Sequence, residues 1–287
     1  MNTRNHRKVP DKWFQFIEKE AEKKELVARP SLSYWQDAWI RLRKNKMAML
    51  GLIFLVILGF MAIFGPIMTP YDVNAQNLPN QYQPPSSEHW FGTDSAGRDV
   101  FTRTWYGARI SLFVGLVAAF IDVFIGIIWG GISGYKGGKT DTVMMRIIEI
   151  LYGIPSLLVT ILLLVVFGPS LFTIILALAI TGWVGMARIV RGQVLQIKNY
   201  EFVHASQSFG GKASRIIRKH LLPNTMGPII VQMTLSVPTA IFAEAFLSFI
   251  GLGIQAPHAS WGVMANDARG AIVSGNWWTL FVPAFFI

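Results

Sequence analysis

The sequence predicts an all-α, polytopic membrane protein. Of its 287 residues, 52% are hydrophobic and only 15% are charged, whereas a soluble domain carries about 25% charged residues. Five apolar runs are long enough to cross a bilayer, which takes about 20 residues in a helix. Basic residues gather in polar segments between these runs, as they do in loops that face the cytosol.

The apolar runs define the expected spans. A sixth run, 277–287, covers only about 16 Å at 1.5 Å per residue, about half of a hydrocarbon core roughly 30 Å thick. We therefore expect an incomplete sixth span, and expect that residue 287 is not the natural end of the protein. The five complete spans are predicted at 47–68, 107–135, 143–168, 170–190 and 226–250.

The distribution of positive charge predicts the orientation. Twenty-two of the 26 Lys and Arg residues lie in 1–46, 136–146 and 188–219, which share one side of the bilayer if each run crosses once. Because cytosolic loops are enriched in Lys and Arg, we expect a cytosolic N-terminus, with 69–106 and 251–276 outside. This pattern accounts for the net charge of +10 without nucleic acid as a partner, and indicates contact with membrane lipid.

The tail 1–46 contains two amphipathic stretches before the first span, 47–68. In 11–28, Trp13 and Ile17 share one face with other apolar residues, although a solvated helical tail would show the same pattern. In 34–46, aromatic residues repeat at helical spacing beside basic ones. Such a helix would lie in the membrane interface as an elbow before the first span.

A polar, basic insert interrupts the apolar sequence within the predicted cytosolic loop 191–225. Residues 200–224 read YEFVHASQSFGGKASRIIRKHLLPN. We expect a short helix, a break at Gly210-Gly211, where glycine permits a left-handed helix cap, and a second short helix ending at Leu222-Pro223. An insert of this kind adds nothing to a lipid-facing fold, so it suits the docking of a cytosolic protein.

Three acidic residues lie within the predicted spans, namely Asp122, Glu149 and Glu244. An ionised carboxylate in lipid costs about 2.5–3.5 kcal/mol or more, so each should face the bundle or a cavity. Glu149 lies one turn from Arg146, which predicts a local ion pair at the cytosolic edge. Asp122 and Glu244 have no basic residue nearby in the sequence. We expect Glu244 to face the translocation path or a partner chain.

Small residues and prolines predict how the spans pack. Small residues four positions apart allow helices to approach closely, and we expect those of the second span to pack and to bind nothing. Pro155 and Pro238 are expected to kink the third and fifth spans, either beside a water-filled cavity or in ordinary packing. The small residues of the second span are Ser111, Gly115, Ala119, Gly126, Gly130 and Gly134.

No pattern for catalysis or metal binding is present. Residues 133–140, SGYKGGKT, nearly match a phosphate-binding loop, but Ser133 replaces the first glycine and the segment leaves a membrane helix instead of a strand. The sequence contains no Cys, and the His residues lack metal-binding spacing. We expect neither an enzyme nor a bound cofactor. The dispersed histidines are His6, His89, His204, His220 and His258.

Three separated motifs carry a family resemblance. The insert resembles the Glu-Ala-Ala…Gly…Leu-Pro loop of the inner-membrane subunits of ATP-binding-cassette (ABC) importers, with His204-Ala205-Ser206 in the Glu-Ala-Ala slot and Gly210 and Leu222-Pro223 in place. Residues 89–112, containing HWFGTDSAGRDV and YGARISL, and residues 243–262, containing AEAFLSFIGLG and SWG, resemble the second permease subunits of dipeptide, oligopeptide and nickel importers. The resemblance covers about 32–287.

The resemblance implies a type I importer bundle in 107–287 and a permease subunit of an ATP-driven peptide importer in a bacterial plasma membrane. The alternatives are a permease of a nickel or other small-solute importer and, from a different class, a stand-alone channel or secondary transporter. The implied partners are a second permease subunit, two cytosolic ATPases that hold ATP and Mg, and an extracytoplasmic solute-binding protein. The implied ATPase-coupling residues are Glu201, Phe202, His204, Ala205, Ser206, Gly210, Leu222 and Pro223.

Overall fold

A computed structural model describes residues 33–255 and 257–287. The amphipathic stretch 11–28 lies outside the described residues. The chain divides into two units, Met1–Val56 and Ile57–Ile287. Within the described residues the structure is helical, apart from loops and one isolated bridge between Thr93 and Asp99.

The first unit confirms a helix before the first span. Helix α1, Tyr34–Lys44, begins at a capping box in which the Ser33 hydroxyl accepts a hydrogen bond from the backbone N–H of Gln36, and the Gln36 side chain accepts one from the N–H of Ser33. Its last turn is basic, which suits a helix C-terminus. The Asn45 side chain then caps the start of α2, Lys46–Phe64. The interfacial position of α1 stays a prediction.

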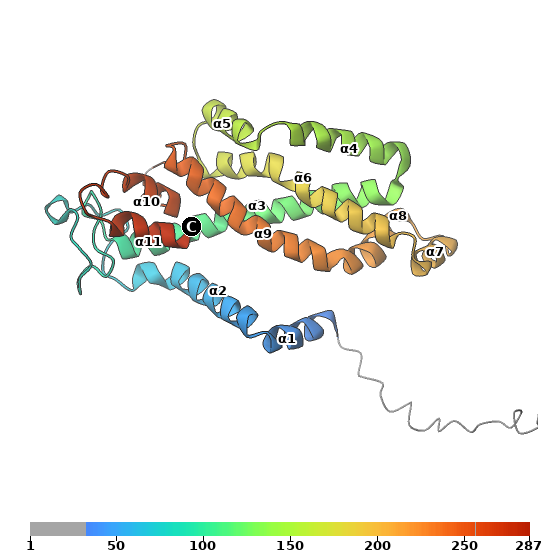
Figure 1. The fold of residues 1–287 in the computed structure, drawn as a ribbon, viewed down its shortest axis with the longest axis horizontal. Coiled ribbons are helices and arrows are strands. Elements are labelled where there is room, and N and C mark those ends of the chain that lie inside the picture. The colour runs from blue at the N-terminus through green and yellow to red at the C-terminus, as the bar shows by residue number, and fades with distance from the viewer. Residues whose placement is uncertain (1–32, 256) are drawn as a thin grey trace, which may run out of the picture. The chain divides into compact units, whose positions relative to one another are not determined.

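The second unit is a helical bundle built on three long helices, α3 (Val100–Lys136), α6 (Leu171–Ile197) and α9 (Leu222–Phe249) (Figure 1). Both α6 and α9 pack against α3. Among the described residues of the whole chain, four helical segments are long and apolar enough to cross a membrane, or five if the bent pair Gly138–Gly153 and Ser156–Phe167 counts as one span. The shorter helices are α10 (Trp261–Asp267) and α11 (Trp278–Phe286) near one end of the bundle, and α7 (Glu201–Ser208) and α8 (Ala213–Ile216) near the other.

Glycines on α3 allow close helix packing, as predicted. A Cβ at Gly130 would lie 2.8 Å from the Cβ of Val190 and 2.9 Å from the backbone nitrogen of Arg191. At Gly126 it would meet Met186, and at Gly134 it would meet Val194. The repeat of small residues therefore lets α3 and α6 touch along several turns.

We expect Gly130→Ala to destabilise the bundle by about 1–3 kcal/mol, the usual cost of overpacking, because the new methyl group meets backbone atoms of α6. Gly192→Ala, on α6, is the matched control: its Cβ would meet nothing within 4 Å, so better helix propensity leaves it neutral or slightly stabilised. Thermal unfolding of the purified protein in detergent would measure both. Equal midpoints for the two variants would contradict close packing at Gly130.

The predicted third span, 143–168, is two helices instead of one kinked helix. Helix α4 (Gly138–Gly153) and α5 (Ser156–Phe167) meet at an angle of 76°. Ile154 between them is extended, with ψ 124°, because a residue that precedes proline is disfavoured in the helical region. Pro155 thus ends a helix where a kink was expected.

Helix α3, which contains the predicted second span, begins at Val100 and so extends into the predicted outer loop 69–106. Asp99 caps α3, because its carboxylate accepts hydrogen bonds from the backbone N–H and the hydroxyl of Thr102, at 2.8 and 2.7 Å. The other carboxylate oxygen of Asp99 lies 2.9 Å from Nδ1 of His89, whose ring stacks on Tyr71. These contacts hold the segment before α3 to the start of that helix.

The predicted end of a short helix at Leu222-Pro223 is wrong. The chain is helical from Ala213 to Phe249, and it passes through a π-helical stretch, Ile217–Leu221, just before Pro223. Proline lacks an N–H and crowds the carbonyl four residues back; the wider π turn displaces that carbonyl. Helix α9 also continues through Pro228 and Pro238. The helix is therefore not interrupted at Pro238, where a kink was predicted.

Candidate functional site

Helix α7 buries one side chain against the bundle. Val203 is fully buried, in a cluster that includes Val194, Ile216 and Leu221, and it is the single buried residue of α7. The rest of this eight-residue helix is exposed or half-exposed. Helix α7 is thus a small projection with an apolar anchor, as the sequence of the insert predicted.

The predicted break after α7 is confirmed. Gly210 has a φ of +74°, a conformation that costs other residues energy. The N–H of Gly210 donates to the Gln207 carbonyl, and the N–H of Gly211 donates to the Ser206 carbonyl, both at 2.9 Å. These bonds satisfy carbonyls that the helix end leaves free, and the chain then reverses into α8.

The predicted coupling residues do not all lie together. Phe202, Ser206 and Gly210 line one groove of about 560 Å³ with Lys212 and other basic residues. Glu201, His204 and Ala205 lie on the exposed part of α7. Leu222 is half-buried and Pro223 exposed in the first turn of α9, and neither lines this groove.

Phe209 was missed by the sequence analysis. It lines the same groove and is 91% exposed. Phe202 lines this groove too, and exposed apolar side chains that gather in one place mark contact surfaces. The position of Phe209 directly before the Gly210 break, in a loop predicted to be cytosolic, is the signal that would have identified it.

Polar contacts join the helices at the end of the bundle that carries α7, and one of them involves α7 itself. The Arg191 guanidinium donates two hydrogen bonds to the Asp141 carboxylate, both at 2.6 Å. The ammonium of Lys198 donates to the carbonyl of Gly134 at 3.0 Å, and Gln207 of α7 donates to the Tyr135 hydroxyl at 3.4 Å. A displacement of α7 would therefore act on the ends of α3 and α6.

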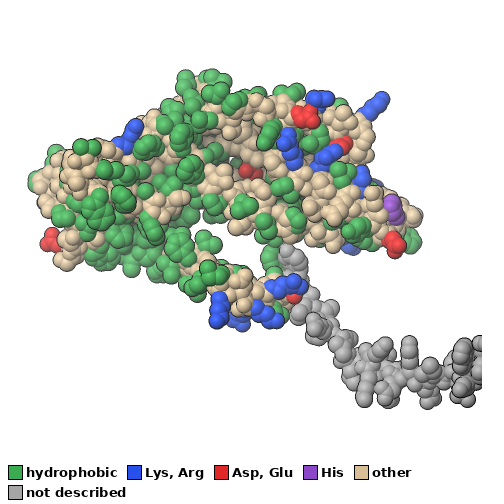
Figure 2. Space-filling model, in the orientation of Figure 1, with side chains coloured by type: hydrophobic (Ala, Val, Ile, Leu, Met, Phe, Trp, Pro, Cys, Tyr) green, Lys and Arg blue, Asp and Glu red, His purple; other side chains and the backbone are tan. Residues whose placement is uncertain are grey.

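Positive charge gathers at this end of the second unit (Figure 2). Lys212, Arg215 and Lys219 border the groove. At the opposite end, Arg98 is paired with acids, 2.7 Å from Asp94 and 3.2 Å from Asp267. The bundle is therefore electrostatically asymmetric along its long axis.

Glu149 forms the predicted ion pair. Its carboxylate lies 2.8 Å from a guanidinium nitrogen of Arg146, and both side chains are more than half exposed. An exposed pair of this kind contributes about 0–1 kcal/mol. Glu149 is a surface residue and lines none of the cavities described below.

The prediction for Glu244 is wrong: it faces neither an open path nor a free surface. It is fully buried, and its carboxylate accepts hydrogen bonds from the hydroxyls of Ser248 (2.8 Å), Ser260 (2.7 Å) and Ser111 (3.2 Å). Three hydroxyl donors replace the missing base. Ser111, expected only to pack, thus also joins α3 to α9 through this hydrogen bond.

The serine cluster around Glu244 joins three helices. Ser111 belongs to α3, and its oxygen also accepts from the backbone N–H of Trp261. Ser260 caps α10 by accepting from the N–H of Val263. The indole N–H of Trp261 donates to the Thr104 carbonyl at 2.9 Å. These bonds attach the segment after α9 to the bundle, which is a structural role.

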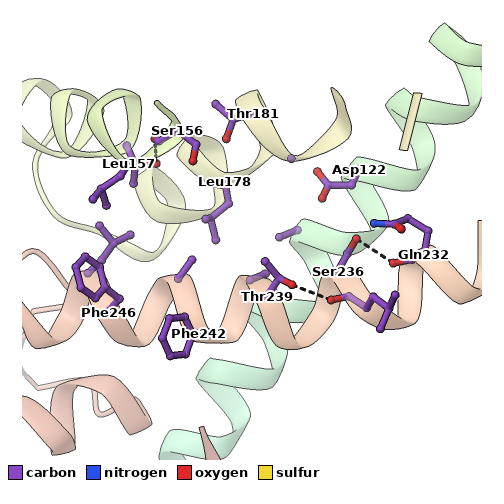
Figure 3. A pocket seen from close by; sticks show the side chains of 17 residues that line it. Asp122, Ser156, Leu157, Leu178, Thr181, Gln232, Ser236, Thr239, Phe242 and Phe246 are labelled. Carbon is purple, nitrogen blue, oxygen red and sulfur yellow. Dashed lines mark hydrogen bonds between the residues drawn. The ribbon is translucent and has the colours of Figure 1, made fainter. Parts of the chain in front are cut away.

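Asp122 lines a cavity of about 580 Å³ between α3, α5, α6 and α9 (Figure 3). Cavities of about 300–1,000 Å³ are typical of small-molecule sites. Apolar side chains from α5 and α9 form part of the wall, and hydroxyls and one amide form the rest. The polar residues of the wall are Asp122, Ser156, Thr160, Thr181, Gln232, Ser236 and Thr239.

Comparisons with known proteins agree with these features. The family described as "Binding-protein-dependent transport system inner membrane component" matches residues 123–287, more than half of the chain. The chain belongs to this family. The family described as "N-terminal TM domain of oligopeptide transport permease C" matches residues 33–85 of the permease.

Relatives match the permease over nearly its whole length. It is 67% identical to the dipeptide transport system permease protein DppC of Bacillus subtilis, over 98% of this chain and 88% of that protein. It is 56% identical to the oligopeptide transport system permease protein OppC of the same organism, over 97% and 91%. A chain of the inward-facing methionine transporter MetNI aligns with a TM-score of 0.49 and 19% identity, over 63% and 92%.

The family match confirms the resemblance and the all-helical, polytopic class of an importer permease. This permease has no group of three or more His, Cys, Asp or Glu side chains placed to hold a metal ion among its described residues. Its candidate sites are thus a projection at the basic end and a cavity inside the bundle. Neither match assigns a role to individual residues of these sites.

Proposed function

We propose that this permease forms half of the translocation pathway of an ATP-driven peptide importer. The observation that carries the substrate class is its 67% identity to a dipeptide permease and 56% identity to an oligopeptide permease. A cavity of about 580 Å³ within the bundle is large enough for a small solute.

The family description, a binding-protein-dependent transport system, supports a set of partners for this permease. A second permease subunit completes the pathway, two cytosolic ATPases hold ATP and Mg, and an extracytoplasmic solute-binding protein delivers the peptide. This chain binds no cofactor. The exposed Phe202 and Phe209 beside a basic groove suit an ATPase surface that offers an apolar pocket edged by acids, because aromatic anchors dominate such interfaces.

The proposed orientation has α7 and the N-terminus in the cytosol of a bacterial cell, with the permease in its plasma membrane. Support comes from the basic residues near α7 and the matched charges at the opposite end of the bundle, since cytosolic loops are enriched in Lys and Arg.

Uptake measurements test the function. A strain that lacks only this chain should lose uptake of radiolabelled Ala-Ala and regain it when the chain is restored. If the deletion strain loses nickel uptake but keeps peptide uptake, the chain belongs to a nickel importer instead. Peptide uptake that persists without any ATPase subunit would contradict the coupled mechanism.

Thiol labelling tests the orientation. Because the sequence contains no Cys, Ser87→Cys should react with a membrane-impermeant thiol reagent added to intact cells, and so should Ser274→Cys. Lys139→Cys and Lys212→Cys should react only after the membrane is opened. All four positions are exposed, so access to the reagent depends on the side of the membrane. Reversed labelling would overturn the proposed orientation.

A further inference from the structure

An unpartnered carboxylate lies in the wall of the cavity inside the bundle. Asp122 is only 8% exposed, and its Oδ1 has no hydrogen-bond partner among the described residues. Figure 3 shows the carboxylate directed into the cavity, away from the helix that carries it. A buried charge without a partner is costly, so this carboxylate is suited to a ligand that supplies a positive charge or a hydrogen-bond donor.

Asp122 lies deep within its helix. Lys136, at the C-terminal end of α3, is about 21 Å away along the helix at 1.5 Å per residue. Because the hydrocarbon core is roughly 30 Å thick, the carboxylate lies at membrane depth. An ionisable residue at this depth generally marks a path for ions or solutes.

A glycine on the facing helix makes room for the carboxylate. A Cβ built at Gly182 of α6 would collide with both carboxylate oxygens of Asp122. The Asp122 side chain therefore lies directly against the backbone of α6. Its direction into the cavity depends on the absence of a side chain at residue 182.

The rest of the cavity offers mainly hydrogen-bond acceptors. The hydroxyls of Ser236 and Thr239 donate to the carbonyls of Gln232 and Leu235, at 3.1 and 2.9 Å. The hydroxyl of Thr160 likewise donates to a carbonyl of its own helix. Their oxygens keep free lone pairs, and no Lys, Arg or His is among the described residues that line the cavity.

We infer that this cavity binds the protonated amino group of the transported solute, with Asp122 as its counter-ion. An ammonium has three donors and no acceptor, so it matches a carboxylate surrounded by hydroxyl oxygens. A divalent cation prefers six or more oxygen ligands, usually with several carboxylates, and here there is one. This inference rests on the proposed function, because a peptide with a free N-terminus carries such a group.

Apolar side chains complete the fit to a peptide. Phe242 and Phe246 of α9 line the cavity beside the polar residues. They offer a surface for apolar side chains of the solute, with no charge that would select one sequence. The cavity would thus recognise what peptides share, their amino terminus, and tolerate what differs between them.

Thiol chemistry in the assembled transporter tests the charge of the site. Thr181→Cys places a thiol in the cavity wall, in a chain without native Cys and with the cysteines of the partner subunits replaced. A trimethylammonium-ethyl methanethiosulfonate should react faster than the sulfonate analogue, relative to their rates with a free thiol. Asp122→Asn should reduce this preference about tenfold, equivalent to about 1.4 kcal/mol. No preference with Asp122 present means a proton or a partner's cation already occupies the carboxylate, and overturns the inference.

Protection by peptides tests the amino group. Ala-Ala should slow labelling of Thr181→Cys about tenfold more than N-acetyl-Ala-Ala at the same concentration, and Asp122→Asn should abolish the difference. Equal protection by the two peptides, or a difference that survives Asp122→Asn, overturns the inference. Both peptides are added without the solute-binding protein, so that its own selection plays no part.

A pair of glycine variants tests the position of the carboxylate. Gly182→Ala should displace Asp122 and lower the preference for the cationic reagent. Gly185→Ala, on the same helix, should not, since its Cβ would meet nothing within 4 Å. Equal preferences in the two variants would contradict the role of Gly182.

Uptake of Ala-Ala by the same transporter separates this inference from the proposed function. If Ala-Ala is taken up but protects Thr181→Cys no better than N-acetyl-Ala-Ala does, only the amine site is overturned. The opposite outcome is a transporter that moves no peptide but still reacts faster with the cationic reagent when Asp122 is present. That outcome overturns the peptide assignment, and with it the amine site as stated.

Discussion

Ala205→Glu should reduce peptide uptake at least about tenfold while the bundle stays folded. Ala205 lies on the exposed part of α7, where the proposed ATPase surface would cover it. A carboxylate buried there without a partner costs about 2–5 kcal/mol, and 1.4 kcal/mol already corresponds to a factor of ten. Uptake and ATP hydrolysis by the assembled transporter in proteoliposomes, with co-purification of the ATPases, measure the loss.

Thr140→Glu is the matched control for Ala205→Glu. Thr140 is exposed in the first turn of α4, near the same end of the bundle, and an acid is favourable at a helix N-terminus. Uptake should be unchanged in this variant. If Ala205→Glu also leaves uptake and co-purification unchanged, α7 is not the docking surface.

Gly210 provides a second, independent test of the same segment. A Cβ there would meet nothing within 4 Å, so any effect of a substitution comes from its φ of +74°. Asn tolerates this conformation and β-branched residues do not. Gly210→Val should therefore impair coupling, and Gly210→Asn should retain most of it.

The parts of the fold that could be predicted depend on local signals. Each apolar run predicts a span because a helix of about twenty apolar residues matches the thickness of the hydrocarbon core. The break at Gly210 could be predicted because the need for a positive φ is a property of one residue. The ion pair of Arg146 and Glu149 could be predicted because one helical turn brings them together.

Prolines were the least reliable local signal. Pro155 ends α4, whereas Pro223, Pro228 and Pro238 lie inside one continuous helix. The difference lies in neighbouring residues: a π-helical stretch precedes Pro223, and packing against α3 and α6 stabilises the rest. A proline removes one hydrogen bond, and tertiary contacts can compensate for that loss.

The roles of the intramembrane acids could not be predicted, because their surroundings come from distant segments. Ser111 lies 133 residues from Glu244, and serines carry no pattern that marks them as partners of a carboxylate. The cavity at Asp122 depends on Gly182 and on α9. Both acids looked alike in the sequence, yet Glu244 is hydrogen-bonded to three serines and Asp122 lines a cavity with one oxygen unpaired.

Glu244→Ala should destabilise the permease by about 3 kcal/mol or more, the largest effect expected for a single side chain. The substitution leaves the hydroxyls of Ser111, Ser248 and Ser260 without their acceptor. A buried donor left unsatisfied costs about 1–3 kcal/mol, and the deleted side chain adds a cavity. The change in unfolding midpoint of the purified protein, followed by the fluorescence of its Trp residues, measures the loss.

Two further variants show whether the hydrogen bonds of Glu244 are responsible. Glu244→Gln keeps an acceptor oxygen for Ser248 and Ser260 but presents an amide donor to Ser111, so it should lose less stability than Glu244→Ala. Glu149→Ala, which removes an exposed ion pair, should stay within about 0.5 kcal/mol of the unmodified protein, as surface substitutions usually do. If Glu244→Ala is no more destabilised than Glu149→Ala, the serine cluster does not hold α10 to the bundle, and Glu244 would have to act on a partner chain or on the solute.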